Sequence, residues 1–289
     1  MRPLAFCGLF LFLVCSGACR GDSQAGDGPL DAGAGSTDDY LSDASSGEVP
    51  AHGTFLLSLV APLVETPGFT SVLGKAYDGP YPQGVVWEDQ TGTVLCRLYV
   101  PRVPFCDPPC NASTEVCVDD NLCQAYPTAV SVGTVQVEGM ATSFAMDPVN
   151  NTYQVTGVTL PYPPFAEGDE LTFAASGSAS VAAFSMTAKG IAPLSVPNDE
   201  ILVDGSPVTL SWVPPDNPAI STVSVMFDIS YHGGTKGIVE CECPDTGSVV
   251  VPGEMLVELI GLGTSGFPKV EFTRQSFGVT DPPIPVTLT

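Results

Sequence analysis

The stretch Thr222-Val-Ser-Val-Met-Phe-Asp-Ile-Ser-Tyr231 is the clearest structural signal in the chain. Its large apolar residues recur at every second position, and this period places them on one face of an extended strand. The turn His232-Gly233-Gly234-Thr235 follows, and Gly237–Cys243 then alternates again. Two alternating runs joined by a glycine-containing turn predict a β-hairpin.

Similar runs recur every 8–15 residues through the chain and are separated by Gly, Pro, Asn or Asp. This spacing predicts an all-β fold of immunoglobulin-like or related β-sandwiches. Only Val251–Ile260 has helical spacing, so one short helix is expected. The other predicted strands are Thr54–Ala61, Thr70–Tyr77, Gly92–Val100, Val130–Glu138, Thr152–Leu160, Glu170–Ala175, Val181–Thr187, Pro207–Trp212, Val270–Phe277 and Pro285–Leu288.

The composition narrows the range of functions. The chain has 32 acidic and 9 basic residues, a net charge of −23, and 44% hydrophobic residues. Such a charge argues against binding to nucleic acid and against docking on anionic lipid through a basic patch. The hydrophobic content predicts a folded protein, and 30 Gly with 28 Pro favour short strands and turns over long helices.

The N-terminus indicates export. Arg2 precedes the apolar run Leu4–Val14, and the small residues Ser16-Gly17-Ala18 lead to Cys19. The apolar run is too short to span a bilayer, so residues 1–18 are predicted to be a signal peptide. The ending resembles the lipobox of bacterial lipoproteins, which implies cleavage before Cys19 and lipidation of that cysteine. In enterobacterial lipoproteins an aspartate after the lipidated cysteine retains the protein in the inner membrane. Arg20 stands at that position here, so the same resemblance implies the outer membrane or cell surface. An ordinary signal peptide, giving a periplasmic or secreted protein, is the alternative.

Residues 19–52 form the next predicted segment. They are rich in Gly, Ala, Ser and Asp, with seven acidic residues and one basic residue. A segment of this composition cannot bury enough apolar surface to offset the entropy of ordering it. We therefore expect a disordered acidic tether behind the lipidated cysteine.

The rest of the chain divides into three parts. Residues 53–100 form a β-strand region, 101–127 a small Cys-rich module, and 128–289 a β-sandwich region of one or two subdomains. The first region has about 48 residues, which is few for an independent core. It forms either a small sheet or part of a sandwich that continues beyond the Cys-rich module.

The Cys-rich module contains Cys106, Cys110, Cys117 and Cys123 within a segment of low apolar content. Four thiolates are able to bind zinc, but an exported protein favours disulfides. Four cysteines allow three pairings, and the sequence does not choose among them. The spacing resembles the compact half of an EGF-like module, and this resemblance implies the pairs Cys106–Cys117 and Cys110–Cys123.

The last loop of the module carries Asp119-Asp120-Asn121. Oxygen ligands of this kind suit calcium, which would be the only cofactor, but one loop rarely supplies six to eight of them. A solvated acidic turn is the alternative, and neither a cofactor nor another metal is otherwise expected.

Three further cysteines lie in alternating segments. Cys241 and Cys243 share one face of their predicted strand, with Glu240 and Glu242 on the other. Cα atoms two residues apart on a strand are roughly 6.5–7 Å from each other and their side chains run parallel, which disfavours a mutual disulfide. We expect Cys96 to pair with one of the two and the third cysteine to be buried and free.

The order of these features resembles that of exported lipoproteins of myxobacteria and related bacteria. The matching features are the segment Ser16–Cys19, the Cys106–Cys123 spacing and the hairpin Tyr231–Gly237 with Asp245-Thr246-Gly247. The resemblance covers most of the mature chain and implies no particular activity.

Catalytic motifs are scarce. Only His52 and His232 are present, and the chain has no Gly-x-Ser-x-Gly, His-Glu-x-x-His, Walker A or Rossmann pattern. The turn residue His232 and the stiff segment containing Tyr162 and Phe165 are candidates for binding loops, with packing or turn roles as the alternative.

These observations favour a non-enzymatic, lipid-anchored envelope protein with a recognition, adhesion or structural role. Its expected partners are the membrane, through the anchor, and an envelope or extracellular protein or glycan. An exported polysaccharide hydrolase that uses acidic residues is one alternative, and a calcium-dependent binding module is another. A convergent carboxylate pair in a deep aromatic cleft would favour the hydrolase, and flat sheet faces would favour recognition.

Overall fold

The structure is a computed structural model that describes residues 51–62, 65–197, 201–281 and 286–289. The predicted signal peptide, Cys19 and nearly all of the tether lie outside the described residues. Strands make up 44% of the chain and helix 4%, so the predicted all-β sandwich fold with a disulfide module and one short helix is confirmed. Within the described residues, no helix has the length and hydropathy needed to cross a lipid bilayer.

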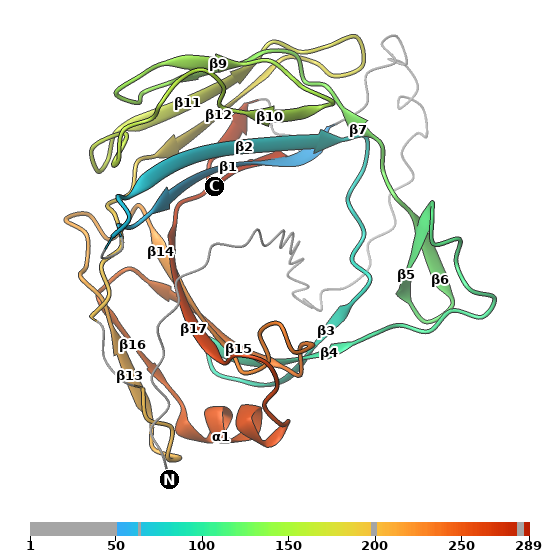
Figure 1. Ribbon diagram of the computed structural model, residues 1–289, viewed down its shortest axis with the longest axis vertical. Helices are drawn as coiled ribbons and strands as arrows, with labels where there is room; N and C mark the ends of the chain where they lie inside the picture. Colours follow the sequence, from blue (N-terminus) through green and yellow to red (C-terminus); the bar gives the residue numbers. More distant parts are fainter. Residues whose placement is uncertain (1–50, 63–64, 198–200, 282–285) are drawn as a thin grey trace, which may run out of the picture.

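The first sandwich lies at the top of Figure 1 and consists of two sheets. One sheet has the order β10-β2-β1-β19, with β7 on β2, and the other has the order β18-β12-β11-β8-β9. Their inner faces enclose one hydrophobic core. The strands are β1 His52–Val60, β2 Phe69–Tyr77, β7 Ala129–Val130, β8 Val135–Glu138, β9 Phe144–Met146, β10 Thr152–Gln154, β11 Glu170–Ala175, β12 Phe184–Lys189, β18 Val279–Asp281 and β19 Val286–Leu288.

The second sandwich lies at the bottom of Figure 1 and has its own core. Its main sheet, which we call the β14 sheet, has the order β17-β14-β15-β4-β3. The β13–β16 pair and helix α1 belong to the same core. The elements are β3 Val86–Gly92, β4 Cys96–Arg102, β13 Val208–Ser211, β14 Thr222–Asp228, β15 Ile238–Pro244, β16 Ser248–Val251, α1 Gly253–Gly261 and β17 Lys269–Gln275.

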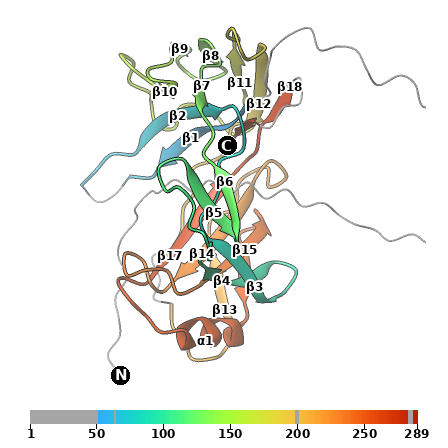
Figure 2. The ribbon, with the colours of Figure 1, turned by 90° about the vertical axis from the view of Figure 1, so that its right-hand side faces the viewer.

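The predicted region 53–100 is divided between the two sandwiches. Strands β1 and β2 pair in the first sandwich, while β3 and β4 form the edge of the β14 sheet in the second. The Cys-rich module contributes a separate hairpin of β5 Glu115–Asp119 and β6 Leu122–Ala125, which projects at the right of Figure 1 and faces the viewer in Figure 2.

The core of the first sandwich is built around Phe55. This side chain is fully buried, and its ring centroid lies 5.3 Å from that of Tyr153 and 6.3 Å from that of Phe173. Gly74 lies directly opposite Phe55 on β2, and a Cβ atom there would be 2.3 Å from the phenyl ring. The glycine at this position therefore makes room for the ring that fills the core.

Several element boundaries differ from the sequence prediction. The predicted strand Gly92–Val100 is broken by a turn, because the Thr93 hydroxyl accepts hydrogen bonds from the amides of Leu95 and Cys96. The predicted tether, residues 19–52, extends two residues too far. Ala51 is buried, and His52 of β1 pairs with Tyr77 of β2.

Three other expected segments are shorter or displaced. The predicted strand Thr152–Leu160 ends at Gln154, and Val130–Glu138 is split into β7 and β8. The helix begins at Gly253 because Val251 ends β16 and Pro252 is the N-cap.

Candidate functional site

The most distinctive surface of the protein is the face of the β14 sheet that points away from the second core, which we call the open face. Alternation along the strands defines it, because Val223, Val225 and Phe227 point into the core and their neighbours point outward. The strand registers then place on the open face Trp87, Arg97, Tyr99, Ser224, Met226, Glu240, Glu242, Glu271 and Thr273.

Two carboxylates stand near the middle of the open face. Glu240 is half-buried and Glu242 is exposed, and they are neighbours on the same side of β15. Burial raises the pKa of Glu240, and the nearby charge of Glu242 raises it further. The Ser224 hydroxyl opposes this shift by donating a hydrogen bond of 3.3 Å to Glu240 Oε1.

The basic residues of the open face are paired with other acids. Arg97 forms an ion pair with Asp89, and Lys269 forms one with Glu271 at 2.5 Å. No ion pair involves Glu240 or Glu242 within the part of the chain that the structure describes. The two carboxylates thus lie on a partly desolvated surface without an ion pair of their own, since Arg97, which lies opposite Glu240, pairs with Asp89.

Aromatic side chains lie on the β3–β4 part of the same face. Trp87 is 44% exposed and lies opposite Pro101, and Tyr99 follows one row further along the same face. A tryptophan exposed to this extent offers a large apolar contact area together with an indole N–H donor.

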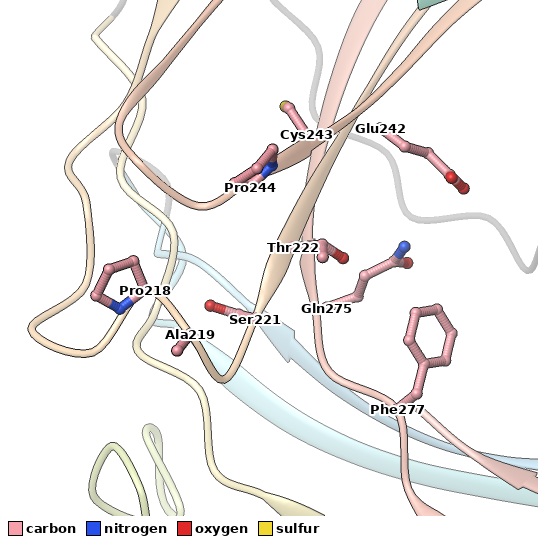
Figure 3. A pocket seen from close by; sticks show the side chains of 9 residues that line it. All are labelled: Pro218, Ala219, Ser221, Thr222, Glu242, Cys243, Pro244, Gln275 and Phe277. Carbon is pink, nitrogen blue, oxygen red and sulfur yellow. The ribbon is translucent and has the colours of Figure 1, made fainter. Parts of the chain in front are cut away.

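A pocket of about 470 Å³ lies at the end of the open face, where β14, β15 and β17 meet the loop before β14 (Figure 3). Glu242, Gln275 and the exposed ring of Phe277 line one part of it, and Pro218 and Ala219 line another. The pocket combines one carboxylate, one amide and apolar walls, a set suited to binding a polar group attached to an apolar body.

The Asp245-Thr246-Gly247 segment is a tight turn between β15 and β16 with a buried structural carboxylate. The Thr246 amide donates to the Pro244 carbonyl, and Gly247 has a φ of 97°. Asp245 is fully buried and accepts hydrogen bonds from Trp212 Nε1 at 2.7 Å, from the Ser221 hydroxyl at 2.6 Å and from Arg274. Burial alone would raise the Asp245 pKa, but these hydrogen bonds lower it overall.

The cysteines of the module form two disulfides, Cys106–Cys117 and Cys110–Cys123. This interlocked pairing is the one that the likeness to half of an EGF-like module implies. The Sγ atoms of Cys106, Cys110 and Cys117 lie within 4.8 Å of one another. Each of these sulfurs is in a disulfide, so none is a thiolate able to bind zinc.

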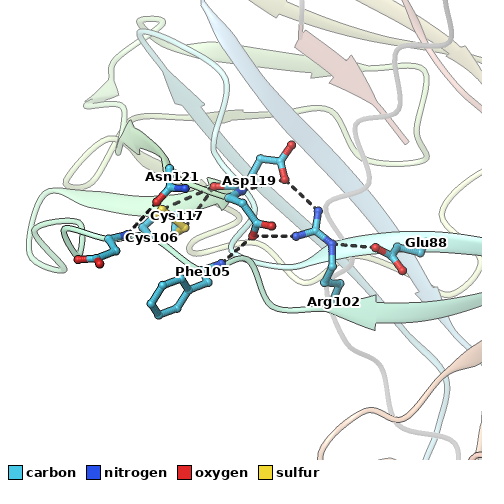
Figure 4. Close-up of polar contacts among 9 residues, drawn as sticks. Glu88, Arg102, Phe105, Cys106, Cys117, Asp119 and Asn121 are labelled. Carbon is cyan, nitrogen blue, oxygen red and sulfur yellow. Dashed lines mark hydrogen bonds and ion pairs between the residues drawn. A yellow bond between two sulfur atoms is a disulfide. The ribbon is translucent and has the colours of Figure 1, made fainter.

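The acidic loop that suggested calcium faces an arginine instead. Arg102 Nη2 lies 2.9 Å from Asp119 and Nη1 lies 3.1 Å from Asp120, while its Nε contacts Glu88 at 2.7 Å (Figure 4). The hydrogen bond from Arg102 lowers the pKa of Asp119, and the amide of Asp120 adds to the shift. Asn121 Oδ1 accepts from the Asp107 amide. These contacts fasten the module to the β3–β4 hairpin and occupy the proposed calcium ligands.

The remaining cysteines lie on the core side of the β14 sheet. Cys96 is bonded to Cys241, directly across β4 and β15, and Cys243 is buried with a free thiol. The Cys243 thiol donates to the carbonyl of Val223 at 3.0 Å, and burial is the main cause that raises its pKa to about 11.

The three binding-loop candidates lie in loops and not in the strands that form the open face. Tyr162 packs its ring against Gly68, and burial raises its pKa. Phe165 packs against Gly190 and the first core. His232 occupies the hairpin turn with a φ of 63°, and its ring lies 4.1 Å from that of Tyr231. The first two thus brace the first sandwich, and the third is a turn residue of the second.

The sequence did not predict strand β3, which carries Trp87, or the contacts of Arg102. Val86–Gly92 has polar residues on both faces, so it lacks the alternation that marks the other strands. No protein-family model, curated protein or solved structure matches the chain.

Proposed function

We propose that the protein is a lipid-anchored envelope protein that binds a partner through the open face of the β14 sheet and carries out no reaction. The observation that supports binding is the pair Glu240–Glu242, which forms no ion pair within the described residues and shares its face of the sheet with the exposed ring of Trp87. Anchoring is supported by the segment Ser16–Cys19, whose pattern suits lipidation, and an outer-membrane or cell-surface location is supported by Arg20, which stands where retained lipoproteins have Asp.

The charge of the body limits the chemistry of the partner. Of its seven basic residues, Arg97, Arg102, Lys189, Lys269 and Arg274 already form ion pairs with acids of the same chain. An acidic surface with so few available cations repels polyanions and favours neutral or cationic partners. A neutral glycan or a basic protein segment of the envelope meets this condition.

The binding face is tested by immobilising the full-length protein and measuring how much of the partner it captures from envelope extract. We expect Trp87→Ala and Glu242→Gln to lower capture by more than about tenfold, as loss of a central aromatic or charged anchor does. The matched controls are Phe267→Ala and Glu258→Gln, which remove an exposed ring and an exposed carboxylate elsewhere. Equal capture by all four variants would refute the open face as the binding surface.

The dependence of capture on ionic strength distinguishes a basic protein segment from a neutral glycan. Capture that weakens steeply between low and high salt indicates a basic protein segment, because surface charges are screened. Capture that resists salt and is lost after digestion of the extract with glycosidases indicates a glycan.

Release from the membrane fraction tests the anchor separately. Cys19→Ala should move the protein from the membrane to the soluble fraction while capture by the purified variant is unchanged. Membrane association that persists in Cys19→Ala would exclude lipidation at this residue.

A polysaccharide hydrolase is the second candidate, and the raised pKa of Glu240 beside Glu242 favours it. Glycosidases use one carboxyl group with a raised pKa as the acid and a second as base or nucleophile. The open face is a sheet surface and the pocket lies at its end, so binding is the stronger proposal. Release of reducing ends from envelope polysaccharide, abolished in both Glu240→Gln and Glu242→Gln, would establish the hydrolase instead.

A further inference from the structure

We propose that strand β4 has two compatible registers on β15, in which Cys96 is bonded either to Cys241 or, after thiol–disulfide exchange, to Cys243. This device is independent of the proposed binding function. It follows from the placement of three cysteines on the core side of one sheet, two of them bonded and one free.

The strand geometry allows the second register. Cys241 and Cys243 lie two residues apart on the buried face of β15, and Cys96 is opposite Cys241. A slip of one residue turns every side chain to the wrong face, but a slip of two residues keeps each on its own face. Moving β4 by two residues therefore brings Cys96 opposite Cys243 and leaves Leu98 pointing into the core.

The shifted register also preserves the pairing of the ladder. The present ladder runs from Ile238 opposite Tyr99 to Cys241 opposite Cys96, and β15 extends beyond it to Pro244. After the shift it would run from Val239 opposite Val100 to Cys243 opposite Cys96, which is one pair longer, because Pro101 has no amide to donate to Ile238. Arg97 would lie opposite Glu242, having exchanged one glutamate neighbour for another.

The chemistry of the exchange is balanced within the chain. The Cys243 thiol loses its proton, and its sulfur attacks Sγ of Cys96. The Cys96–Cys243 bond forms, the Cys96–Cys241 bond breaks, and the leaving Cys241 thiolate takes up a proton. One disulfide and one thiol are present before and after, so no oxidant or reductant is consumed. Attack on Cys241 is disfavoured because the two side chains run parallel on one strand.

The moving part is the β3–β4 hairpin together with the Cys-rich module. Arg102 joins them through Glu88 on β3 and the Asp119 and Asp120 carboxylates of the module, so these contacts travel as a unit. A two-residue shift displaces the hairpin by roughly 7 Å along β15. Tyr99 would move from opposite Ile238 to opposite Glu240, and Trp87 would move with it toward the carboxylates, so the exchange changes the composition of the open face.

The rate of exchange depends on the thiolate form of Cys243. Burial, with the charges of Asp245 and Glu242, raises the pKa of this thiol to about 11. The attacking thiolate is therefore scarce at neutral pH, and its fraction rises about tenfold for each pH unit below that value. We expect exchange to be roughly 100-fold faster at pH 9 than at pH 7.

Acid-quenched disulfide mapping of the oxidised full-length protein tests the proposal. The protein is held at pH 7 or pH 9, acidified, unfolded and labelled with a maleimide, and then cleaved after glutamate without reduction. The sequence Glu240-Cys241-Glu242-Cys243 separates the two cysteines into different peptides under this cleavage. We expect label mainly on Cys243 at pH 7, and label on Cys241 with a Cys96–Cys243 peptide at pH 9.

Two variants complete the experiment. Cys241→Ser should contain a Cys96–Cys243 disulfide, and Cys243→Ser should retain Cys96–Cys241 with no label at either pH. Label confined to Cys243 in the wild-type protein after prolonged incubation at pH 9 would overturn the proposal, whether or not Cys241→Ser folds. A folded, oxidised Cys241→Ser protein with both Cys96 and Cys243 labelled would overturn it as well.

Discussion

The guanidinium of Arg274 donates to both carboxylate oxygens of Asp245, with N–O distances of 2.5 and 3.0 Å, and both side chains are buried. Arg274 also donates to the backbone carbonyls of Ala192, Pro193 and Val213. Residues 192 and 193 belong to the segment that leaves the first sandwich after β12, so one side chain fastens this segment to the second core.

Replacing Arg274 with Ala should therefore be strongly destabilising. The change leaves the Asp245 carboxylate buried without its cation, and loss of one partner of a buried ion pair costs about 3–5 kcal/mol. Urea unfolding measures this cost. The matched control is Lys189→Ala, which breaks the exposed Lys189–Glu170 pair and should cost less than about 1 kcal/mol. Similar losses in the two variants would contradict the structural role of Arg274.

The Asp245 carboxylate should also make the protein less stable in acid. The hydrogen bonds from Arg274, Ser221 and Trp212 hold the pKa of Asp245 below its ordinary value. A folded-state pKa below the unfolded value, about 3.9, gives stability that is present above that pH and is lost as the pH falls through the folded pKa. Melting temperatures at pH 5 and pH 2 should show a smaller fall in Asp245→Asn than in the wild-type protein. An equal fall would assign the acid sensitivity to other groups.

The core of the first sandwich contains a hydroxyl that serves two buried backbone groups. Tyr153 Oη accepts from the Val132 amide at 2.8 Å and donates to the Gly133 carbonyl at 2.9 Å. Tyr153→Phe keeps the ring but leaves the Val132 amide without its partner, at a cost of about 1–3 kcal/mol. Chemical denaturation gives the value. Tyr126→Phe, at an exposed ring, is the control and should change stability by less than about 0.5 kcal/mol.

The contacts of Arg102 predict that calcium leaves the stability of the protein unchanged. A cation at Asp119 and Asp120 would have to displace the guanidinium that already pairs with both. Thermal unfolding with calcium and with a chelator should give the same melting temperature. A calcium-dependent rise would instead support the calcium-binding module.

The same arginine should control the mobility of the Cys-rich module. Arg102→Ala removes the contacts that join Glu88 on β3 to the module, and limited proteolysis should then cut the connecting segment 103–106 faster. Arg97→Ala breaks an ion pair within the same hairpin and is the control, since it should leave that rate unchanged.

In the second sandwich, the residues that face the core were easier to predict from the sequence than the strands at the edge of the sheet. Val223, Val225 and Phe227 lie in the core as the period of two requires, and Glu240 and Glu242 lie on the opposite face. The pairing of Cys96 with Cys241 depends on the register between two strands that are 145 residues apart in sequence, which local pattern does not encode. Strand β3, which carries Trp87, was not predicted for a related reason, because an edge strand with polar residues on both faces has no hydrophobic period.

The open face should lower the stability of the protein at neutral pH, and Glu240 provides the test. Burial and the charge of Glu242 raise its pKa in the folded state. A raised pKa gives stability that is fully present below the unfolded pKa, about 4.3, and is lost as the pH rises through the folded value. At pH 7 the ionised carboxylate therefore opposes folding. Glu240→Gln should raise the melting temperature at pH 7, and the gain should disappear near pH 4.

Glu258→Gln on helix α1 is the matched control, because it removes an exposed carboxylate from the other side of the second core. It should shift the melting temperature little at either pH. If Glu240→Gln gains stability at pH 7 and loses capture of the partner, the open face trades stability for binding, as functional surfaces commonly do. If Glu240→Gln is no more stable than the wild-type protein at pH 7, the Glu240 carboxylate does not destabilise the fold. The proposal that a cationic partner binds at this carboxylate then loses its support.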